Sequence, residues 1–230
     1  MKKSNIATLA VFFLLIPLTL FLGSQLSGRS YYITGTLIIV ELMIPFFMAF
    51  EGRKPQAREL VLMAVMCALA IAGRVVIPLP NFKAIFAIIM LTGIAFGPEA
   101  GFMVGAVSAF ASNFFYGQGP FTPWQMFSYG AGGMLAGFCF RKNWLPRKNW
   151  VMAAFGFLTV LLWMGPLLDS SHLFLMMPRI TWAAIITVLT SGLYVNVSQA
   201  ISTALLLFLL GNPLLEKLER VKVKYGMIEE

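Results

Sequence analysis

Charged residues are scarce in this sequence, and hydrophobic residues dominate it. Only 11% of the 230 residues are Asp, Glu, Lys or Arg, whereas 59% are hydrophobic and the mean hydropathy is +0.84. A soluble domain of this length does not need so much apolar surface to fill its core. The folded chain must therefore face mainly lipid, and we predict an all-α integral membrane protein.

Residues that carry chemistry are also few. His172 is the only histidine, and Cys67 and Cys139 are the only cysteines. The sequence has no phosphate-binding loop, no His-Glu-x-x-His motif and no Gly-x-Ser-x-Gly motif. Both cysteines fall inside apolar stretches, which excludes a disulfide framework. We therefore expect no enzymatic reaction, no cofactor and no metal site.

Acidic residues are nearly absent from the apolar stretches. Glu41 is the only one in the interior of a predicted span, since Glu59 is assigned to the cytoplasmic end of the stretch 58–77, and Asp169 is placed in an outside loop. An ionisable residue inside a membrane is a functional hypothesis by default, and proton coupling is one such role. Because Glu41 lies in the N-terminal hairpin, outside the predicted core, we favour snorkelling or a hydrogen bond between helices.

The apolar stretches are near the length that crosses a bilayer, which is about 20 helical residues. They predict about eight transmembrane helices, the first of which we interpret as a retained helix rather than a cleaved signal. The stretches cover residues 6–22, 31–50, 58–77, 84–97, 100–116, 122–140, 150–168 and 180–210.

The net charge of +8 follows this pattern of spans and does not indicate a nucleic-acid partner. With a cytoplasmic N-terminus, the outside segments contain only Arg29, Arg74, Lys83 and Arg179 of the 17 basic residues. Basic residues gather in the cytoplasmic segments of membrane proteins. We therefore predict a multi-pass protein of the cell membrane with both termini in the cytoplasm.

A polar break at residues 51–56 divides the chain into two parts. We predict a two-helix transmembrane hairpin over 1–56 and a membrane core of about six helices over 57–230, with a cytoplasmic C-terminal tail. Gly211, Asn212 and Pro213 are predicted to stop the last span, because proline does not continue a helix.

Amides and aromatic residues gather in residues 113–125, where one span ends on the outside and the next begins. Glycine and proline make an irregular turn there, aromatic rings offer flat apolar contact, and amides offer donors and acceptors without charge. Asn113 and Gln125 lie within helix ends, where an unpaired amide costs free energy. This chemistry suits a neutral or zwitterionic organic solute. The alternative is an ordinary tight turn with an aromatic interface belt.

Further polar residues on the same side of the predicted bundle complete the candidate site. Arg74, Lys83, Arg179, Tyr194 and Gln199 lie there, although Arg74 and Lys83 also suit the role of interfacial anchors. The predicted substrate-binding residues are Asn81, Asn113, Tyr116, Gln118, Trp124, Gln125, Tyr129 and Asn196.

Two stripes of small residues recur every four positions, a spacing that lets helices approach closely in lipid. The glycine stripe is predicted to pack inside the protein, and the alanine stripe to face a separate membrane subunit. The glycine stripe consists of Gly97, Gly101, Gly105 and Ala109, and the alanine stripe of Ala64, Ala68 and Ala72.

At these residues the chain resembles the substrate-binding S component of energy-coupling factor (ECF) vitamin transporters. The resemblance covers about 57–226 and leaves out the N-terminal hairpin. It rests on the alanine stripe within 64–72, on Phe96-Gly97-Pro98, Gly117-Gln118-Gly119-Pro120 and Trp124-Gln125-Met126-Phe127, and on the closing segment 215–226.

The resemblance implies a six-helix core that binds a vitamin or related micronutrient from the outside, with the outer loops as a lid. It also implies docking, through the alanine stripe, on a coupling membrane protein driven by two ATP-binding cassette (ABC) ATPases, and toppling in the membrane to release the cargo inside. The 117–125 stretch is similar to the subgroup for cobalamin or related corrinoids, which we rank first. A queuosine precursor, pantothenate or another cofactor precursor remains open.

Two other classes of membrane protein compete with this interpretation. A self-sufficient secondary transporter of a small organic solute should show inverted repeats and a coupling carboxylate at mid-membrane. No repeat is visible in the sequence. A ligand-free structural membrane subunit leaves the amides and aromatic residues at 113–125 unexplained.

Overall fold

The computed structural model describes residues 10–25, 30–177 and 180–224, and every regular element in these ranges is a helix. Arg29 and Arg179, on which part of the predicted topology rests, lie outside the described residues. The elements are the π-helical turn η1 (Val11–Leu15), α2 (Ile16–Gln25), α3 (Ser30–Gly52), α4 (Ala57–Val75), α5 (Ile85–Phe96), α6 (Pro98–Tyr116), α7 (Thr122–Arg141), α8 (Asn149–Thr159), the π-helical turn η2 (Val160–Met164), α9 (Gly165–Met176) and α10 (Trp182–Lys224).

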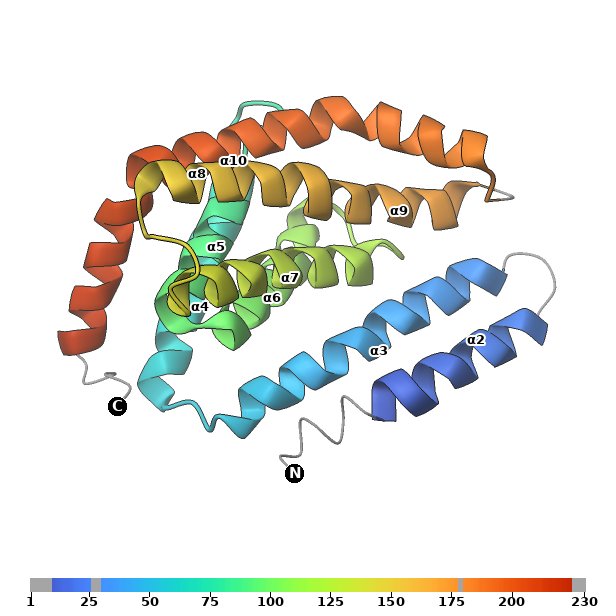
Figure 1. Cartoon of the computed structure of the whole chain (residues 1–230), viewed down its shortest axis with the longest axis horizontal. Helices are drawn as coiled ribbons and strands as arrows, with labels where there is room; N and C mark the ends of the chain where they lie inside the picture. Colours follow the sequence, from blue (N-terminus) through green and yellow to red (C-terminus); the bar gives the residue numbers. More distant parts are fainter. Residues whose placement is uncertain (1–9, 26–29, 178–179, 225–230) are drawn as a thin grey trace.

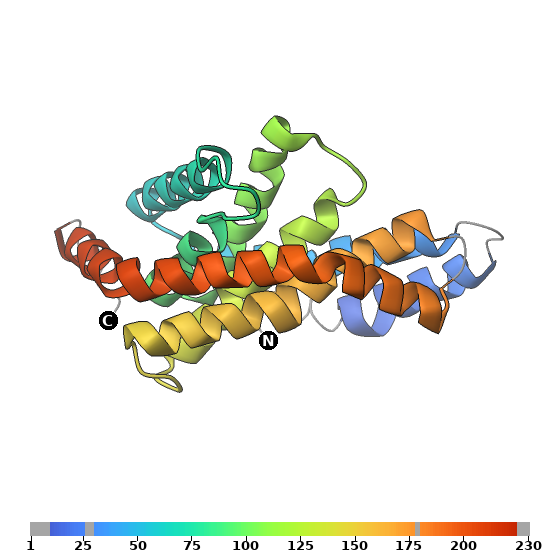
Figure 2. The same ribbon diagram turned by 90° about the horizontal axis from the view of Figure 1, so that it is seen from above.

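Two pairs of neighbouring helices flank a central group. The run of α8, η2 and α9 lies beside α10 along the top of the view, and α2 lies beside α3 at the lower right (Figure 1). Between them α5, α6 and α7 pack against one another and carry much of the buried core. Figure 2 shows α4 at the margin of the bundle, where it packs on α5 and α6 with one of its faces.

The central helices approach so closely that their backbones touch. A Cβ atom added at Gly101 of α6 would lie 2.5 Å from the carbonyl oxygen of Gly133 in α7, and one added at Gly133 would lie 2.4 Å from the carbonyl oxygen of Gly101. Gly93 of α5 faces the same carbonyl of Gly133, and Gly105 faces the carbonyl of Tyr129. In lipid such contacts associate helices by van der Waals packing. The prediction that the glycine stripe packs inside the protein is confirmed.

The run from α8 to α9 is one continuous helix, longer than the predicted span at 150–168. The π-helical turn η2 is a single wider turn within this helix, and the helix continues on both sides of it. Ser128 of α7 donates a buried hydrogen bond of 3.2 Å to the carbonyl oxygen of Met164 within this turn. The prediction that Asp169 lies in a loop is therefore wrong, since the residue belongs to α9.

The last helix, α10, contains 43 residues and continues through Pro213. Figure 1 shows its C-terminal part turning away from the rest of the helix. Proline lacks the N–H of a regular turn and bends a helix that continues past it. Oδ1 of Asn149 accepts a 3.1 Å hydrogen bond from the backbone N–H of Asn212, which ties this region to the start of α8. The helix does not end at 211–213, and the prediction that the last membrane span stops there stays a prediction.

Three described helices are long and apolar enough to cross a membrane, namely Ile33–Gly52, Asn149–Leu175 and Trp182–Lys224. Ile85–Phe96 is a shorter apolar helix. The all-helical character of the described chain is confirmed. The number of about eight spans and the cytoplasmic position of both termini stay predictions.

The N-terminal hairpin packs on the central helices along α3. The ring of Phe102 in α6 lies 4.5 Å from that of Phe46 and 5.8 Å from that of Phe47, measured between centroids. Within the hairpin, Thr19 of α2 donates a hydrogen bond to the carboxylate of Glu41 in α3. This is the contact between helices that the sequence favoured for Glu41.

Three basic side chains converge on the C-terminal end of α5, whose last carbonyl groups have no partner within the helix. The Phe96 carbonyl oxygen accepts hydrogen bonds from Arg141, at 2.9 Å, and from Arg53, at 3.5 Å. Lys222 donates to the Ala95 carbonyl oxygen at 2.8 Å. Cations at this end also complement the helix dipole. The contacts join α5 to α7, to α10 and to the residue that follows α3.

We expect Gly133→Val to lower the free energy of unfolding by about 3 kcal/mol, because the new Cβ would overlap the backbone of α6 rather than a movable side chain. Thermal unfolding of the detergent-purified protein measures the change. Gly52→Val is the matched control, since a Cβ at Gly52 meets nothing within 4 Å. Equal stability of the two variants would contradict the close backbone contact.

Candidate solute-binding site

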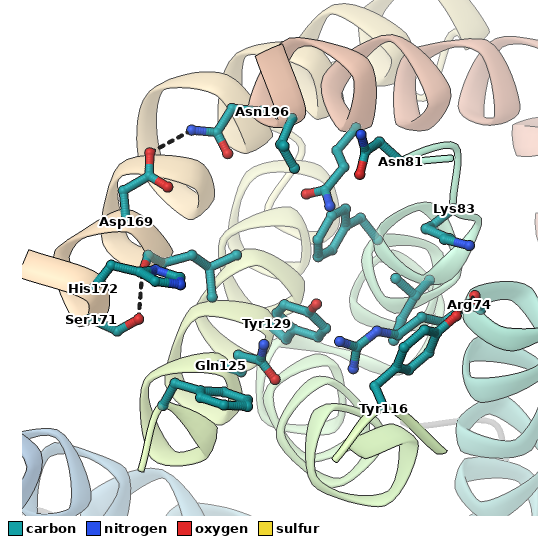
Figure 3. A pocket seen from close by; sticks show the side chains of 16 residues that line it. Arg74, Asn81, Lys83, Tyr116, Gln125, Tyr129, Asp169, Ser171, His172 and Asn196 are labelled. Carbon is teal, nitrogen blue, oxygen red and sulfur yellow. Dashed lines mark hydrogen bonds between the residues drawn. The ribbon is translucent and has the colours of Figure 1, made fainter. Parts of the chain in front are cut away.

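A cavity of about 330 Å³ lies among α4, α7, α9 and α10. The loop from residue 76 to 84 and the end of α6 also contribute to its wall. Its size falls in the lower part of the range of small-molecule sites. Its lining residues are Arg74, Asn81, Lys83, Ile85, Phe86, Tyr116, Phe121, Gln125, Tyr129, Leu168, Asp169, Ser171, His172, Val195, Asn196 and Gln199 (Figure 3).

A chain of hydrogen bonds behind one wall holds Arg74 and Gln125 in place. Arg74, near the end of α4, donates to Oδ1 of Asn113 at 2.9 Å and also to the hydroxyl of Ser112. The Asn113 amide in turn donates to Oε1 of Gln125 at 2.7 Å and to Oγ1 of Thr122 at 3.2 Å. Asn113 is fully buried, so these bonds satisfy an amide that water does not reach. These hydrogen bonds connect α4, α6 and α7, and they fix two residues that line the cavity, Arg74 and Gln125.

Two tyrosines enclose the Arg74 side chain. The guanidinium carbon lies 4.7 Å from the ring centroid of Tyr116 and 5.8 Å from that of Tyr129, distances typical of cation–π contact. The Tyr116 hydroxyl donates to the Arg74 carbonyl oxygen at 2.8 Å, which closes the end of α6 over the end of α4. Tyr129 is buried and meets Phe86 edge-on at 4.8 Å. The cavity therefore has an aromatic wall with an embedded cation.

On the opposite wall, Asp169 of α9 accepts a 2.7 Å hydrogen bond from the amide of Asn196 in α10 (Figure 3). Two glycines make the room for this pair. A Cβ at Gly165 would lie 2.5 Å from the Asn196 amide carbon, and one at Gly192 would lie 2.3 Å from the Asp169 carboxylate. Each helix thus presents a glycine to the polar side chain of the other. His172 and Ser171 lie on the same side of the cavity as Asp169.

The charges of the cavity are separated. Arg74 and Lys83 lie at one side and Asp169 lies at the other, with Gln125 and Tyr129 between them (Figure 3). Lys83 donates to the Ile77 carbonyl oxygen at 3.0 Å. The ion pairs found among the described residues involve none of the three charged residues. The site can therefore offer donors at one end and a carboxylate acceptor at the other.

The structure brings five of the eight predicted binding residues into the cavity lining, as well as Arg74, Lys83 and Gln199. The five are Asn81, Tyr116, Gln125, Tyr129 and Asn196. Asn81 has a positive φ of 58°, which Asn tolerates better than most residues, and this helps to turn the 76–84 loop.

Three predicted binding residues lie outside the lining, each for a physical reason. Asn113 sits behind the wall, where it holds Arg74 and Gln125. Gln118 stays in the turn, because its amide donates to the Phe110 carbonyl oxygen at 2.9 Å and its Oε1 accepts from Thr122. Trp124 is buried against another ring instead of facing the cavity. Tyr194 is also absent from the lining and is 74% exposed.

Sequence reasoning missed Asp169, Ser171 and His172 as lining residues, because it ended the span at residue 168. The signal that could have found them is their spacing. Leu168 and His172 are four positions apart, and Asp169 and His172 three, so a helix that continues past 168 places them on one face.

The alanine stripe lies on the uncovered face of α4. Ala64, Ala68 and Ala72 are all exposed, whereas Met63 and Met66 on the other face are buried. The three alanines are therefore accessible from outside the described chain.

A polar and aromatic cavity enclosed by apolar helices defines a solute-binding membrane protein. Comparison with protein families identifies the kind: the model of the ECF-type riboflavin transporter S component matches residues 54–217. Since the match covers more than half of the chain, the protein belongs to this family and is an S component of an ECF transporter. Neither the curated proteins nor the solved structures gave a match.

The family membership settles several expectations. It confirms the resemblance to ECF S components and places the chain in a transporter family rather than an enzyme family. The match begins at Lys54, directly after the N-terminal hairpin. The corrinoid specificity ranked first from the sequence finds no support, because the matching family is of the riboflavin type.

We expect Asn113→Leu to lower the free energy of unfolding by about 1–3 kcal/mol, because Arg74 and Gln125 each lose a buried partner. Thermal unfolding in detergent measures this loss. Gln199→Leu is the control, since the described hydrogen bonds of Gln199 involve only its backbone carbonyl. An equal loss in both variants would contradict the role given to Asn113.

Proposed function

We propose that this S component binds riboflavin or a closely related flavin and delivers it inward with a coupling membrane protein and two ABC ATPases. The observation that carries the proposal is the 330 Å³ cavity, which combines an aromatic wall with amides and separated charges in a chain of the riboflavin-type family. Riboflavin has matching parts: a flat ring system, an imide edge rich in acceptors, and a chain of hydroxyl groups.

The flavin ring lies beside the aromatic wall in this proposal. The two carbonyl groups of its imide edge need donors, which Arg74, Lys83 and the Gln125 amide supply. The hydroxyl chain needs acceptors, and Asp169 is the strongest acceptor in the lining because a carboxylate accepts at both oxygens. The separated charges thus give the ligand one orientation in the cavity.

The size of the cavity also favours a flavin over a corrinoid. A corrin macrocycle with its side chains is much larger than a flavin, and a 330 Å³ site lies in the lower part of the range for small-molecule ligands. Binding a corrinoid would require the helices around the cavity to separate.

The direction of transport follows from the predicted topology. The loop at 76–84 and the turn at 117–121 lie on the side predicted to face the outside. Substrate enters from that side, and the exposed alanine stripe on α4 is the surface that meets the coupling protein. The ATPases belong to separate chains, in keeping with the lack of a phosphate-binding loop in this sequence.

We expect the purified protein to quench the fluorescence of added riboflavin, and Asp169→Asn to weaken binding roughly tenfold, because a charged acceptor is replaced by a neutral amide of the same shape. Equilibrium titration in detergent measures both. Glu216→Gln, an exposed acid on α10, is the control and should bind like the wild type. Absence of flavin binding by the wild-type protein would reject the proposed ligand.

We expect Ala68→Trp to abolish ATP-dependent uptake while riboflavin affinity stays within about twofold of the wild type, because the indole blocks close helix approach far from the cavity. Uptake by cells that also express the coupling protein and ATPases, and titration of the purified variant, separate the two effects. Ala183→Trp places the same ring at an exposed alanine of α10 as a control. Normal uptake by Ala68→Trp would exclude the alanine stripe as the docking surface.

A further inference from the structure

The N-terminal hairpin contacts a pair of stacked rings directly behind the cavity. Trp124 of α7 and Phe174 of α9 stack with centroids 5.3 Å apart and planes inclined by 29°. Gly35 of α3 packs on both rings: a Cβ there would lie 3.3 Å from Cζ2 of Trp124 and 3.4 Å from Cδ1 of Phe174. Three helices therefore meet at one point through the two rings and Gly35.

Each ring is adjacent in sequence to residues of the cavity. Trp124 precedes Gln125, and Phe174 follows His172 by two residues. The stacked pair therefore sets the spacing between the α7 wall and the α9 wall. Trp124 is only 5% exposed, and its indole N–H has no acceptor among the described residues. Packing and not hydrogen bonding holds the ring in place. This packing role explains why Trp124, which the sequence assigned to the binding site, does not line the cavity.

The α3 helix of the hairpin contacts the rest of the protein at several points, so a larger side chain at Gly35 cannot easily displace α3. Phe46 and Phe47, in the C-terminal third of α3, pack on Phe102, and Arg53 bonds to the carbonyl oxygen of Phe96 just beyond the end of the helix. On the other side of the ring pair, α7 is fixed to α6 by the glycine backbone contacts described above. Pressure on the ring pair from Gly35 would therefore displace α9 first.

We infer that Gly35 is a positioning residue for the solute site, and that the α2–α3 hairpin is a working part of the binding unit rather than an attached anchor. The hairpin acts through Gly35, Trp124 and Phe174. It fixes the distance between the α7 wall of the cavity and the α9 wall, which carries Asp169 and His172. The inference rests on the proposed flavin-binding function and adds the hairpin to it.

The test replaces Gly35 in the full-length chain and compares two flavins. Gly35→Leu is expected to weaken riboflavin binding roughly tenfold, a cost typical of overpacking. Lumiflavin has the ring system without the hydroxyl chain, so it does not use Asp169, and its affinity is expected to change less than about threefold. A general loss of folding would weaken both ligands equally. Gly52→Leu, in open space at the far end of α3, is the matched control and should bind both flavins normally.

A second substitution tests whether the effect of Gly35 passes through the ring of Phe174. Phe174→Leu removes the ring that the new side chain would strike, so riboflavin affinity in the Gly35→Leu, Phe174→Leu double variant should exceed that of Gly35→Leu alone. If Gly35→Leu does not accumulate in membranes, Gly35→Ala serves instead, with an expected effect of about twofold, because its Cβ needs neighbours to give by only a few tenths of an ångström. Unchanged riboflavin affinity, or equal loss of both flavins, would overturn the inference.

Hydrogen exchange separates failure of this inference from failure of the proposed ligand. If the wild-type protein binds neither flavin, the flavin proposal fails, and exchange at residues 165–175 decides the matter of the hairpin. Faster exchange there in Gly35→Leu than in Gly52→Leu supports the positioning role. Identical exchange in the two variants overturns it.

Discussion

The backbone contact between α6 and α7 at Gly101 and Gly133 is the constraint on which the rest of the structure depends. Lipid gives helices no hydrophobic reason to associate, so the missing side chains allow the dispersion contact that holds these two together. With α6 and α7 fixed, Asn113 at the end of one helix reaches Gln125 at the start of the other. The amide pair then fixes Arg74, and one whole wall of the site follows from a contact that carries no functional group.

The sequence could predict those parts of the structure that depend on the spacing of residues near one another in the chain. Small residues every four positions indicated the close packing of α6, and buried amides at helix ends indicated that Asn113 and Gln125 needed polar partners. The Asn113 amide donates to Gln125 and accepts from Arg74, so the polar atoms of Asn113 are paired within the protein, and of the two amides Gln125 lines the cavity. A pattern indicates that a polar group must be paired, but the backbone geometry decides whether its partner is protein or ligand.

The parts that sequence could not predict depend on contacts between distant residues. The helix that carries Asp169 continues because a π-helical turn is held by Ser128 of another helix, and α10 continues past Pro213 beside Asn149. Trp124 stacks on Phe174 of another helix, and both rings pack against Gly35 of α3. None of these partners is near in sequence. Hydropathy therefore placed Asp169 in a loop, and the gathering of amides and aromatic residues in 113–125 placed Trp124 in the site.

The three cations on the end of α5 have a mechanical consequence. Arg53, Arg141 and Lys222 come from segments far apart in the chain, yet they bind adjacent carbonyl groups: the two arginines bind that of Phe96, and the lysine binds that of Ala95. These hydrogen bonds join α5, α7, α10 and the segment after α3. Arg53 also pairs with Glu59 of α4 at 2.9 Å, which connects α4 to the same group. If the four joined segments move as one rigid body, tilting the protein in the membrane moves the cavity without separating the helices that line it.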